Sequence, residues 1–288
     1  MGSGELQIKN QHTGASTKVQ YRDKNGKYDE AALRKIHSVY GANYDDVIQR
    51  MPLRFIEVLS NIQDHFKDAL ILIKSGYRSP TVNQKLRDQG KLAGQSSMHI
   101  EASAADFYMS GVDTVALRDY AKSLECCGVG YYHGQHIHLD TGPKRWWDET
   151  NSGTESKEPQ ENEKIIALTN QDIYKTNEAI QFDIARVTNL PIGITANINL
   201  EKLDKGNWTL LKNIPLDFSK IFPPHSSASN LESDPKRCVT LQNRKEIRQI
   251  LLDKNKLSTG RYRIEVSFCD KQWAKMPDKI NSNEFEIR

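Results

Sequence analysis

The chain has 288 residues, of which 37% are hydrophobic and 27% charged, and this size and composition favour about two soluble globular domains. Its 40 basic and 37 acidic residues give a net charge of only +3, too even a balance to hold a polyanion, which argues against nucleic-acid binding. No apolar run approaches the ~18 residues that cross a bilayer, so we predict no membrane span.

Composition along the chain predicts two domains. The start Met-Gly-Ser-Gly is typical of a cloning remnant, so residues 1–5 are set aside, and we expect a secretory signal to have been removed. Residues 151–163 have no large apolar residue and are rich in Ser, Glu, Asn and Pro, which cannot bury enough surface to fold. We therefore predict a first domain over 6–150, a linker over 151–163 and a second domain over 164–288.

Helical and strand-like patterns mix in the first domain. The expected elements, in chain order, are a helix capped by Asp29, a helix over 55–66, a strand over 70–73, a helix capped by Thr81, a strand over 104–109, a helix capped by Asp113, and a hairpin of 129–132 with 136–141. The connection after the first of these strands carries Arg78. Together the elements indicate an α+β domain with a small antiparallel sheet.

The second domain shows mostly alternating apolar and polar residues between turn signals. Strands are predicted over 179–187, 192–200, 208–211 and 261–268, and they favour an all-β sandwich. The segment 245–252 fits either a short helix or an edge strand. The ending S-T-G-R-Y-R-I-E-V with S-N-E-F-E-I resembles the last strands of bacterial immunoglobulin-like domains, which implies a module that targets the cell wall or surface or acts as a spacer.

The four cysteines say little by their number. Cys126 and Cys127 are adjacent, whereas Cys238 and Cys269 lie far apart in the second domain. The latter two fit a disulfide in an oxidising compartment and equally well two buried free thiols.

Four residues of the first domain have the types and spacing of a metal site. His99 and Asp106 lie seven residues apart, and the small residues between them allow a tight turn that lets both reach one ion. His136 and His138 alternate on the second strand of the predicted hairpin, so both imidazoles lie on one face of the sheet. The pattern favours a three-ligand site of two histidines and Asp106, with an extra histidine beside it and a fourth position open for water.

Several separated motifs are similar to a known peptidase family. They are S-x-H and A-x-D within 97–106, S-G-Y-R-S-P over 75–80, and G-V-G-Y-Y over 128–132 followed by H-x-D-x-G over 138–142. In this order they resemble the zinc D-alanyl-D-alanine carboxypeptidases and murein endopeptidases, and among these the murein endopeptidase K branch. The wider superfamily includes lysostaphin-type enzymes and hedgehog signalling domains. The resemblance covers about residues 6 to 148.

The resemblance implies a zinc-dependent peptidase that hydrolyses stem or cross-link peptide bonds of peptidoglycan. It implies Zn²⁺ ligands at His99, Asp106 and His138. It also implies that Arg78 binds a carboxylate of the wall peptide and that Ser97 lines the substrate groove. A guanidinium suits this task because its planar fork can bind a carboxylate with two hydrogen bonds.

The sequence departs from the family pattern at three places, one of which is Cys126-Cys127 in place of a commoner Gly-Gly. Ala102 stands where the family usually has Gly, which a turn tolerates unless that residue needs a positive φ. Gln135 stands where several relatives carry a Glu that acts as general base, and an amide cannot accept the proton. His136 is therefore the first candidate to position or deprotonate the attacking water, and His133 is the second, unless either is a solvated hairpin residue. Asp140 is expected to orient a ligand imidazole or to be only a strand-end turn residue.

Two functions of different class fit these residues. In the first, the protein is a periplasmic or secreted metallopeptidase acting on peptidoglycan, and His136 favours it. In the second, catalysis is weakened and the zinc-containing domain is a cell-wall-binding module, which Gln135 favours. We predict the enzyme, because a complete ligand set together with Arg78 is poorly explained by packing alone. The bond that it cuts, D,D or L,D, stays open.

Overall fold

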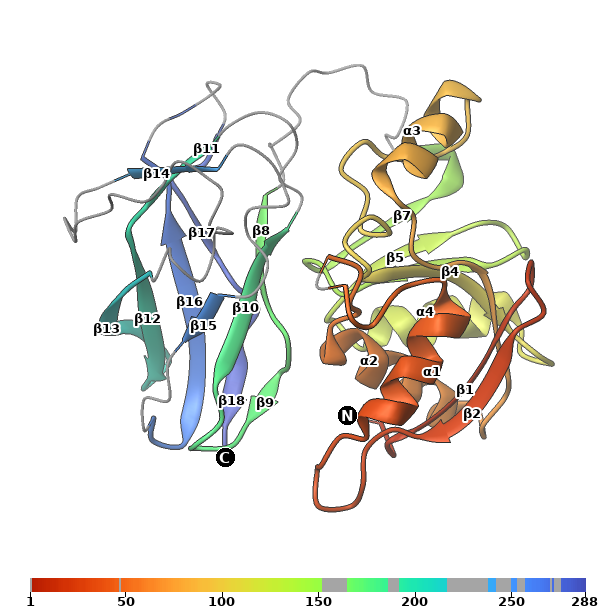
Figure 1. Cartoon of the computed structure of the whole chain (residues 1–288), viewed down its shortest axis with the longest axis horizontal. Coiled ribbons are helices and arrows are strands. Elements are labelled where there is room, and N and C mark those ends of the chain that lie inside the picture. The colour runs from red at the N-terminus through yellow and green to blue at the C-terminus, as the bar shows by residue number, and fades with distance from the viewer. Residues whose placement is uncertain are drawn as a thin grey trace. The chain divides into compact units, whose positions relative to one another are not determined.

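The computed structural model describes residues 2–46, 48–151, 165–185, 192–216, 238–241, 250–252, 257–269, 271 and 276–288. The chain divides into two compact units, Met1–Lys157 and Glu158–Arg288, each with its own hydrophobic core (Figure 1). All but the first residue of the predicted linker lies outside the described residues. Within the described ranges, no helix combines the length and the apolar character needed to cross a membrane.

The first unit is a mixed α/β structure with a seven-stranded sheet in the order β2-β1-β3-β4-β6-β5-β7. Its strands are β1 (Glu5–Asn10), β2 (Ser16–Gln20), β3 (Ile71–Ser75), β4 (Ala104–Met109), β5 (Gly128–Tyr131), β6 (Ile137–Asp140) and β7 (Arg145–Asp148). Its helices are α1 (Glu30–Tyr40), α2 (Leu53–His65), α3 (Pro80–Asp88) and α4 (Thr114–Ser123), and a 3-10 turn spans Glu149–Asn151.

The sheet is not purely antiparallel. Strand β1 runs parallel to β3, and β5 runs parallel to β7, whereas the other four neighbouring pairs are antiparallel. The prediction of an antiparallel sheet is therefore wrong for these two pairs. Strands β1, β2 and β7 were not predicted. Neither β2 nor β7 contains a buried residue that would give it a clear apolar alternation, whereas β1 buries Leu6 and Ile8 at alternate positions, a signal that the prediction did not use.

Local sequence signals set the helix ends. The Asp29 carboxylate accepts hydrogen bonds from two backbone N–H groups of the first turn of α1, at 2.8 and 3.2 Å, and Gly41, with φ of 87°, ends that helix. Asp113 caps α4 in the same way, so both predicted caps are confirmed. The predicted cap Thr81 is wrong. Ser79 caps α3, because the proline after it fits the first helical position, where no N–H is needed.

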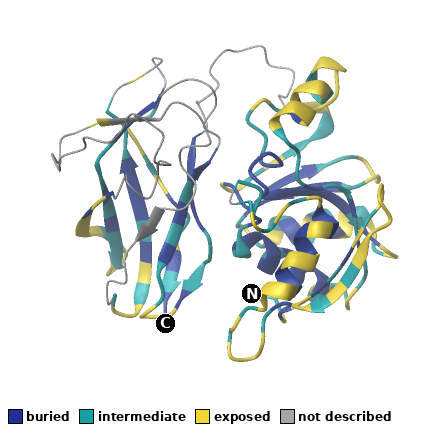
Figure 2. Ribbon diagram, in the orientation of Figure 1, coloured by how far each residue is buried: buried dark blue, intermediate teal, exposed yellow. Residues whose placement is uncertain are grey.

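Alternation along the strands gives the sheet two unlike faces. One face carries apolar side chains such as Ile73 and Phe107, and it packs with α1, α2 and α4 into a core that appears as buried in Figure 2. Residues at the alternate positions, among them Lys74, Asp106 and His138, point to the opposite side, which we call the polar face. No residue of α3 belongs to the core.

The second unit is all-β in its described residues, in agreement with the predicted class. Its strands are β8 (Ile166–Thr169), β9 (Ile173–Tyr174), β10 (Ile180–Ala185), β11 (Ile192–Thr195), β12 (Asn197–Asp204), β13 (Asn207–Pro215), β14 (Cys238–Leu241), β15 (Ile250–Leu252), β16 (Gly260–Ser267), β17 (Lys279–Asn281) and β18 (Phe285–Ile287). They form the sheets β15-β10-β8, β11-β14 and β13-β12-β16-β18-β9, with β17 beside β16. Of the ambiguous segment 245–252, the last three residues are a strand and the others lie outside the described residues.

All four cysteines form disulfides. Cys238 is bonded to Cys269, with Cα atoms 5.9 Å apart, and Cys126 is bonded to its neighbour Cys127. Of the two alternatives for Cys238 and Cys269, the structure has the disulfide, which ties β14 to the segment after β16. Bonds of this kind persist in oxidising compartments.

A buried imidazole lies in the last turn of α1. The Nδ1 atom of His37 donates to the Leu33 carbonyl oxygen at 2.7 Å, and its Nε2 accepts the Met51 N–H at 2.8 Å, so the ring is satisfied in its neutral form. Burial is the main reason that the pKa of His37 falls from 6.5 to about 4, and the Arg50 guanidinium adds to the effect.

We expect this histidine to make the protein less stable in mild acid. Between pH 6.5 and about 4 the unfolded chain protonates His37 and the folded chain does not. The free energy of unfolding should therefore fall by about 2 kcal/mol between about pH 7 and about pH 5. Urea unfolding, with hydrogen exchange of α1 as the local probe, measures this. The His37→Gln variant should be less stable at neutral pH but should lose that part of the pH dependence; an unchanged dependence would contradict the assignment.

Candidate metal centre

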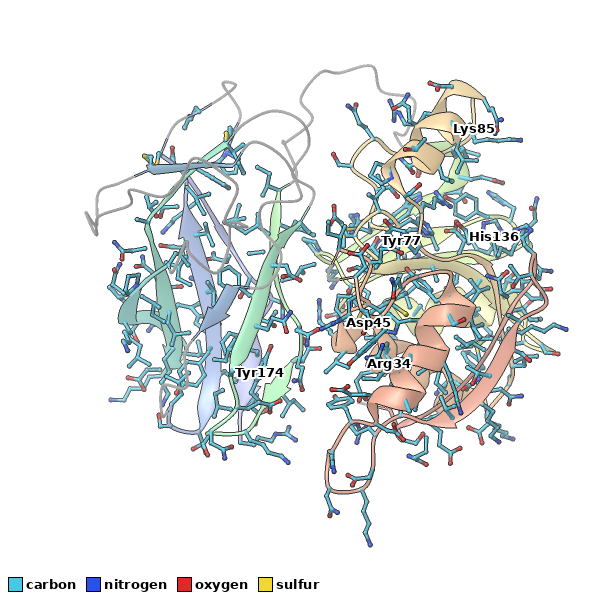
Figure 3. The ribbon with its side chains drawn as sticks, in the orientation of Figure 1. Arg34, Asp45, Tyr77, Lys85, His136 and Tyr174 are labelled. Carbon is cyan, nitrogen blue, oxygen red and sulfur yellow. A yellow bond between two sulfur atoms is a disulfide. The ribbon has the colours of Figure 1, made fainter. Side chains whose placement is uncertain are left out.

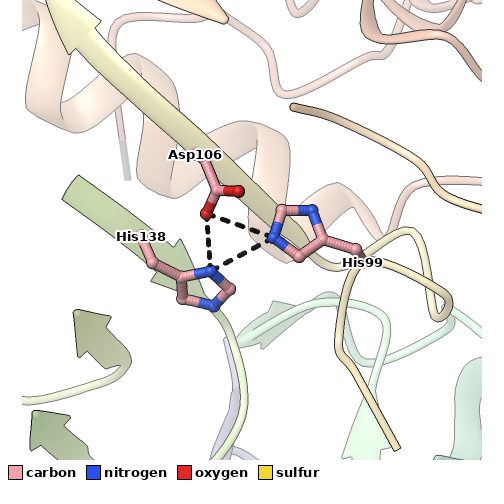
Figure 4. Close-up of side chains that lie close together, drawn as sticks. All are labelled: His99, Asp106 and His138. Atoms are coloured by element: carbon pink, nitrogen blue, oxygen red, sulfur yellow. Dashed lines mark hydrogen bonds and ion pairs between the residues drawn. The ribbon is translucent and has the colours of Figure 1, made fainter. Parts of the chain in front are cut away.

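Two strands and a loop bring two histidines and an aspartate together (Figure 4). Asp106 on β4 and His138 on β6 are direct partners in an antiparallel ladder, so their side chains leave the polar face side by side. His99 comes from the loop between α3 and β4. All three residues are buried. The structure thus brings together the three ligands predicted from the sequence.

The facing atoms of these residues form a small triangle. The Nε2 atom of His99 lies 3.2 Å from Oδ1 of Asp106 and 3.2 Å from Nδ1 of His138, and the latter two atoms are 2.9 Å apart. A tetrahedral ion with ligands at about 2.0–2.1 Å holds them roughly 3.3 Å from one another. The triangle is therefore close to the one that a single tetrahedral ion requires.

Hydrogen bonds on the far side of each ring determine which nitrogen carries the proton. His99 Nδ1 lies 2.8 Å from the Gly76 carbonyl oxygen, which can only accept, so this nitrogen donates. His138 Nε2 lies 2.9 Å from Oδ2 of Asp140 and donates in the same way. In the neutral rings, the two nitrogens that face Asp106 then carry lone pairs. Two lone pairs and a carboxylate oxygen converge on one point, which fits a cation at that point.

The pKa shifts of His99, Asp106 and His138, which together we call the metal cluster, also favour a cation at this point. Burial alone would raise the pKa of Asp106, but His99 and the hydrogen bond to His138 hold it well below its usual value. Burial acts to lower the pKa of His138, but its contacts with Asp106 and Asp140 raise it. Burial lowers the pKa of His99, and Arg78 adds to the effect. The cluster thus favours one positive charge among its atoms, either a proton on His138 or a metal ion.

Two glycines of β5 make room behind the metal cluster. A Cβ on Gly128 would lie 2.6 Å from Oδ2 of Asp140, and one on Gly130 would lie 2.6 Å from the Trp147 ring. Both distances are shorter than any ordinary contact, so a larger residue at either position would displace these groups. The Gly-Val-Gly motif is therefore explained by close packing on the polar face.

The buried Asp140 carboxylate holds His138 in place. Besides the bond to His138, it accepts hydrogen bonds from Nη1 and Nη2 of Arg145 at 3.0 and 2.6 Å and from the Gly142 N–H at 2.9 Å. Burial would raise the pKa of Asp140, but His138 and Arg145 together lower it far below its usual value. Asp140 is therefore an ionised acceptor that keeps the proton of His138 on Nε2.

Arg78 contacts the same cluster from the side of β3. Its Nη2 donates to Oδ2 of Asp106 at 2.6 Å, and its Nε donates to the Ser75 hydroxyl at 2.8 Å. The oxygen that it binds is not the one that faces the histidines. Arg78 thus orients the Asp106 carboxylate, and its guanidinium is already partly neutralised.

His136 lies at the hairpin end of the polar face (Figure 3). Its ring is half-buried and stacks on Tyr132, with centroids 4.4 Å apart and planes 9° from parallel. Its Nδ1 lies 3.3 Å from Nζ of Lys74. Burial is the main reason that the pKa of His136 falls to about 4, so the ring is neutral at neutral pH.

His133 and Ser97 lie in different settings. His133 is exposed at the tip of the hairpin, where its Nε2 lies 2.9 Å from Asp148, so the structure does not bring it to the metal cluster. The half-buried Ser97 hydroxyl accepts the N–H of His99 at 3.3 Å and so borders the cluster. Ala102 has φ of 53°, the left-handed conformation that favours glycine, in the turn that leads to β4.

Sequence reasoning missed several residues around the cluster. They are Lys74, Tyr132, Arg145 and Trp147. Lys74 carried a signal, since it directly follows the apolar strand 70–73 and so falls on the face opposite to Ile73. Burial raises the pKa of the Tyr132 phenol, and Trp147 lies close enough for its indole to lower that pKa by a smaller amount, a contact that no sequence pattern predicts.

Comparison with known proteins identifies the family of the first unit. A model of the family described as Peptidoglycan L,D-endopeptidase MepK matches residues 2–147, just over half of the chain, and this stretch contains the whole metal cluster. The chain belongs to this family. The membership in the murein endopeptidases that the motifs predicted is thereby confirmed.

Individual MepK proteins show the same similarity. The peptidoglycan L,D-endopeptidase MepK of Escherichia coli (strain K12) is 31% identical over 144 residues, which cover 49% of this chain and 79% of that protein. The probable peptidoglycan L,D-endopeptidase MepK of Haemophilus influenzae is 31% identical over 145 residues, 49% of this chain and 77% of that protein. A solved structure of Pseudomonas fluorescens alkylpurine DNA glycosylase AlkC bound to DNA containing an abasic site analog covers 43% of this chain and 30% of its own, with 12% identity and a TM-score of 0.23, too low to indicate a shared fold.

Replacing Asp140 tests the hydrogen bond behind His138. In Asp140→Asn the negative charge that holds the Nε2 proton is lost, and we expect the affinity for Zn²⁺ to fall about 10- to 100-fold. Competition with a chelator measures this. Asp148→Asn is the matched control, because it also removes a carboxylate that contacts a histidine, but at the exposed hairpin tip. Equal affinities in both variants would show that Asp140 does not set the orientation of the ligand.

Proposed function

We propose that this protein is a zinc-dependent peptidoglycan peptidase and that it hydrolyses L,D peptide bonds within the wall, the activity named for its MepK relatives. The observation that carries the proposal is the convergence of two imidazole lone pairs and one carboxylate oxygen on a single point of a chain that belongs to this family. The two nitrogen donors and one oxygen donor are spaced like three corners of a tetrahedron, which suits Zn²⁺ and leaves the fourth corner for water.

The metal would supply the electrophile. When bound, zinc would activate water and polarise the scissile carbonyl. The chain's own residues would hold its ligands: Asp140 keeps the His138 proton on Nε2, the Gly76 carbonyl does the same for His99 Nδ1, and Arg78 orients Asp106. Ser97 would border the substrate groove beside these residues, and Arg78 keeps its proposed contact with a substrate carboxylate.

His136 would act on the attacking water or on the carbonyl oxygen. The Lys74 ammonium can only donate, so Nδ1 of His136 is the acceptor in their contact, and the neutral ring carries its proton on Nε2. An Nε2–H group can position water or stabilise the oxygen on which negative charge develops. Of the two roles predicted for His136, this tautomer favours positioning over deprotonation. His133, exposed and paired with Asp148, has less support for either role.

The second unit would assist the peptidase by binding to the cell wall or surface outside the cytoplasm. We propose that it is an immunoglobulin-like domain that targets the enzyme to the cell wall or surface, in the periplasm or after secretion. Its all-β architecture supports this, and the two disulfides support an oxidising compartment.

Digestion of purified peptidoglycan tests the activity. We expect the zinc-loaded protein to release new muropeptides, separated by chromatography and identified by mass, whose new ends show cleavage at an L,D bond. His138→Ala and a chelator-treated sample should release none, because each removes the metal. Walls of different cross-link type serve as parallel substrates. If zinc binds stoichiometrically and no wall is altered, the catalytic proposal fails and the wall-binding alternative takes its place.

Two substitutions of His136 separate its possible roles. His136→Ala should lower kcat by about 10²- to 10³-fold, the usual effect of removing one polarising donor. His136→Gln supplies an N–H near the position of Nε2 and should recover part of the loss if the ring positions an oxygen atom. Equal losses in the two variants would point to proton transfer instead. His133→Ala, at the hairpin tip, should keep the wild-type rate; a comparable loss there would move the role to His133.

A further inference from the structure

The metal cluster has an excess of cations on the polar face. Of the two carboxylates that contact the histidine ligands, Asp106 is paired with Arg78 and Asp140 is paired with Arg145. Lys74 is the third cation beside the cluster, and it is half-buried. In the described part of the chain, no carboxylate lies within ion-pair distance of its ammonium group, whose one short polar contact is with Nδ1 of His136.

A half-buried lysine whose ammonium has no anionic partner is an unusual arrangement. Partial burial weakens the hydration of a charged group. A neutral imidazole compensates for the lost hydration energy less than a carboxylate does. The Zn²⁺ ion of the proposed function would add further positive charge a short distance away. The polar face beside the cluster therefore attracts a negatively charged group that the protein itself does not provide.

The strand register places Lys74 beside the reaction site. Ser75, the next residue, is the partner of Asp106 across β3 and β4, and His136 stands two residues before His138 on the other side of β4. The contact between Lys74 and His136 thus bridges β4 at the hairpin end of the metal cluster. A substrate group bound by Lys74 would lie next to the His136 ring and on one side of the metal.

We propose that Lys74 is a specificity-determining residue that binds a free carboxylate of the wall peptide, on a residue adjacent to the scissile bond. This inference rests on the proposed function and names the feature of the substrate that the site selects. Arg78 cannot bind this carboxylate in addition to the one already proposed for it, because its Nη2 and Nε are engaged by Asp106 and Ser75. Lys74 has three donor hydrogens and directs at most one of them to His136.

Two matched substrates make the test specific. One is a soluble cross-linked wall peptide with free carboxylates, and the other is the same peptide with those carboxylates converted to primary amides. Binding of both to the zinc-free protein is measured by calorimetry, so that no hydrolysis occurs, and kcat and KM are measured with the zinc-loaded protein. The proteins are wild type, Lys74→Met, Lys74→Arg and Lys9→Met. Lys9 is an exposed lysine of β1 that pairs with Leu72 and lies farther along the same sheet.

We expect wild type to bind the free acid about tenfold more tightly than the amide and to show the same preference in KM. Lys74→Met should lose this preference by weakening only toward the acid, Lys74→Arg should keep most of it, and Lys9→Met should match wild type. Circular dichroism and zinc stoichiometry of Lys74→Met show whether the variant is folded; if it is not, Lys74→Arg and Lys74→Gln are compared instead.

Three results would overturn the inference. They are a wild type that does not discriminate between acid and amide, a Lys74→Met variant that still discriminates, and a Lys74→Met variant that loses kcat equally on both peptides with unchanged binding. The last result would mean that Lys74 acts through His136. The proposed function fails separately, if zinc-loaded wild type cleaves neither peptide.

Discussion

Two buried hydrogen bonds, from His99 Nδ1 to the Gly76 carbonyl and from His138 Nε2 to Asp140, are the constraint on which the rest of the site depends. Each bond assigns a proton to the far side of a ring and leaves a lone pair on the near side. With Asp106 between them, the near sides repel one another unless a positive charge lies among them. The site is therefore organised for a cation, and we propose that its affinity for a metal ion would depend on residues that would not touch the ion.

The sheet supplies these constraints through alternation. Odd and even positions on each strand face opposite sides, so one set of residues closes the core against the helices while the other set builds the site. Gly128 and Gly130 leave space on the polar face, and Asp140, Arg145 and Trp147 fill it. Because the ladder between β4 and β6 pairs Asp106 with His138, a slip of one residue in that register would leave only one of the two side chains on the polar face.

The sequence predicted the parts of this structure that depend on local chemistry. The Asp29 and Asp113 caps, the class of each unit and the convergence of His99, Asp106 and His138 follow from patterns of a few residues. It did not predict the parallel pairing of β1 with β3 or of β5 with β7, because neither β1 nor β7 was predicted as a strand, and β7 contains no buried residue. The partners of Arg78 and Lys74 also stayed hidden, since both are decided by tertiary contacts between segments distant in the chain.

The same alternation bears on the missing carboxylate at Gln135. A residue two positions before a strand ligand shares its face, whereas a residue three positions before it shares that face only if the chain leaves the strand geometry. In this hairpin Gln135 is an exposed turn residue whose N–H donates to the Tyr132 carbonyl oxygen at 3.0 Å, and β6 begins at Ile137. His136 is thus the hairpin residue that the backbone brings to the metal cluster, stacked on Tyr132 and held by Lys74. With Gln135 the turn lacks a side chain that can accept a proton. The polar face still carries the neutral imidazole of His136, two residues before His138.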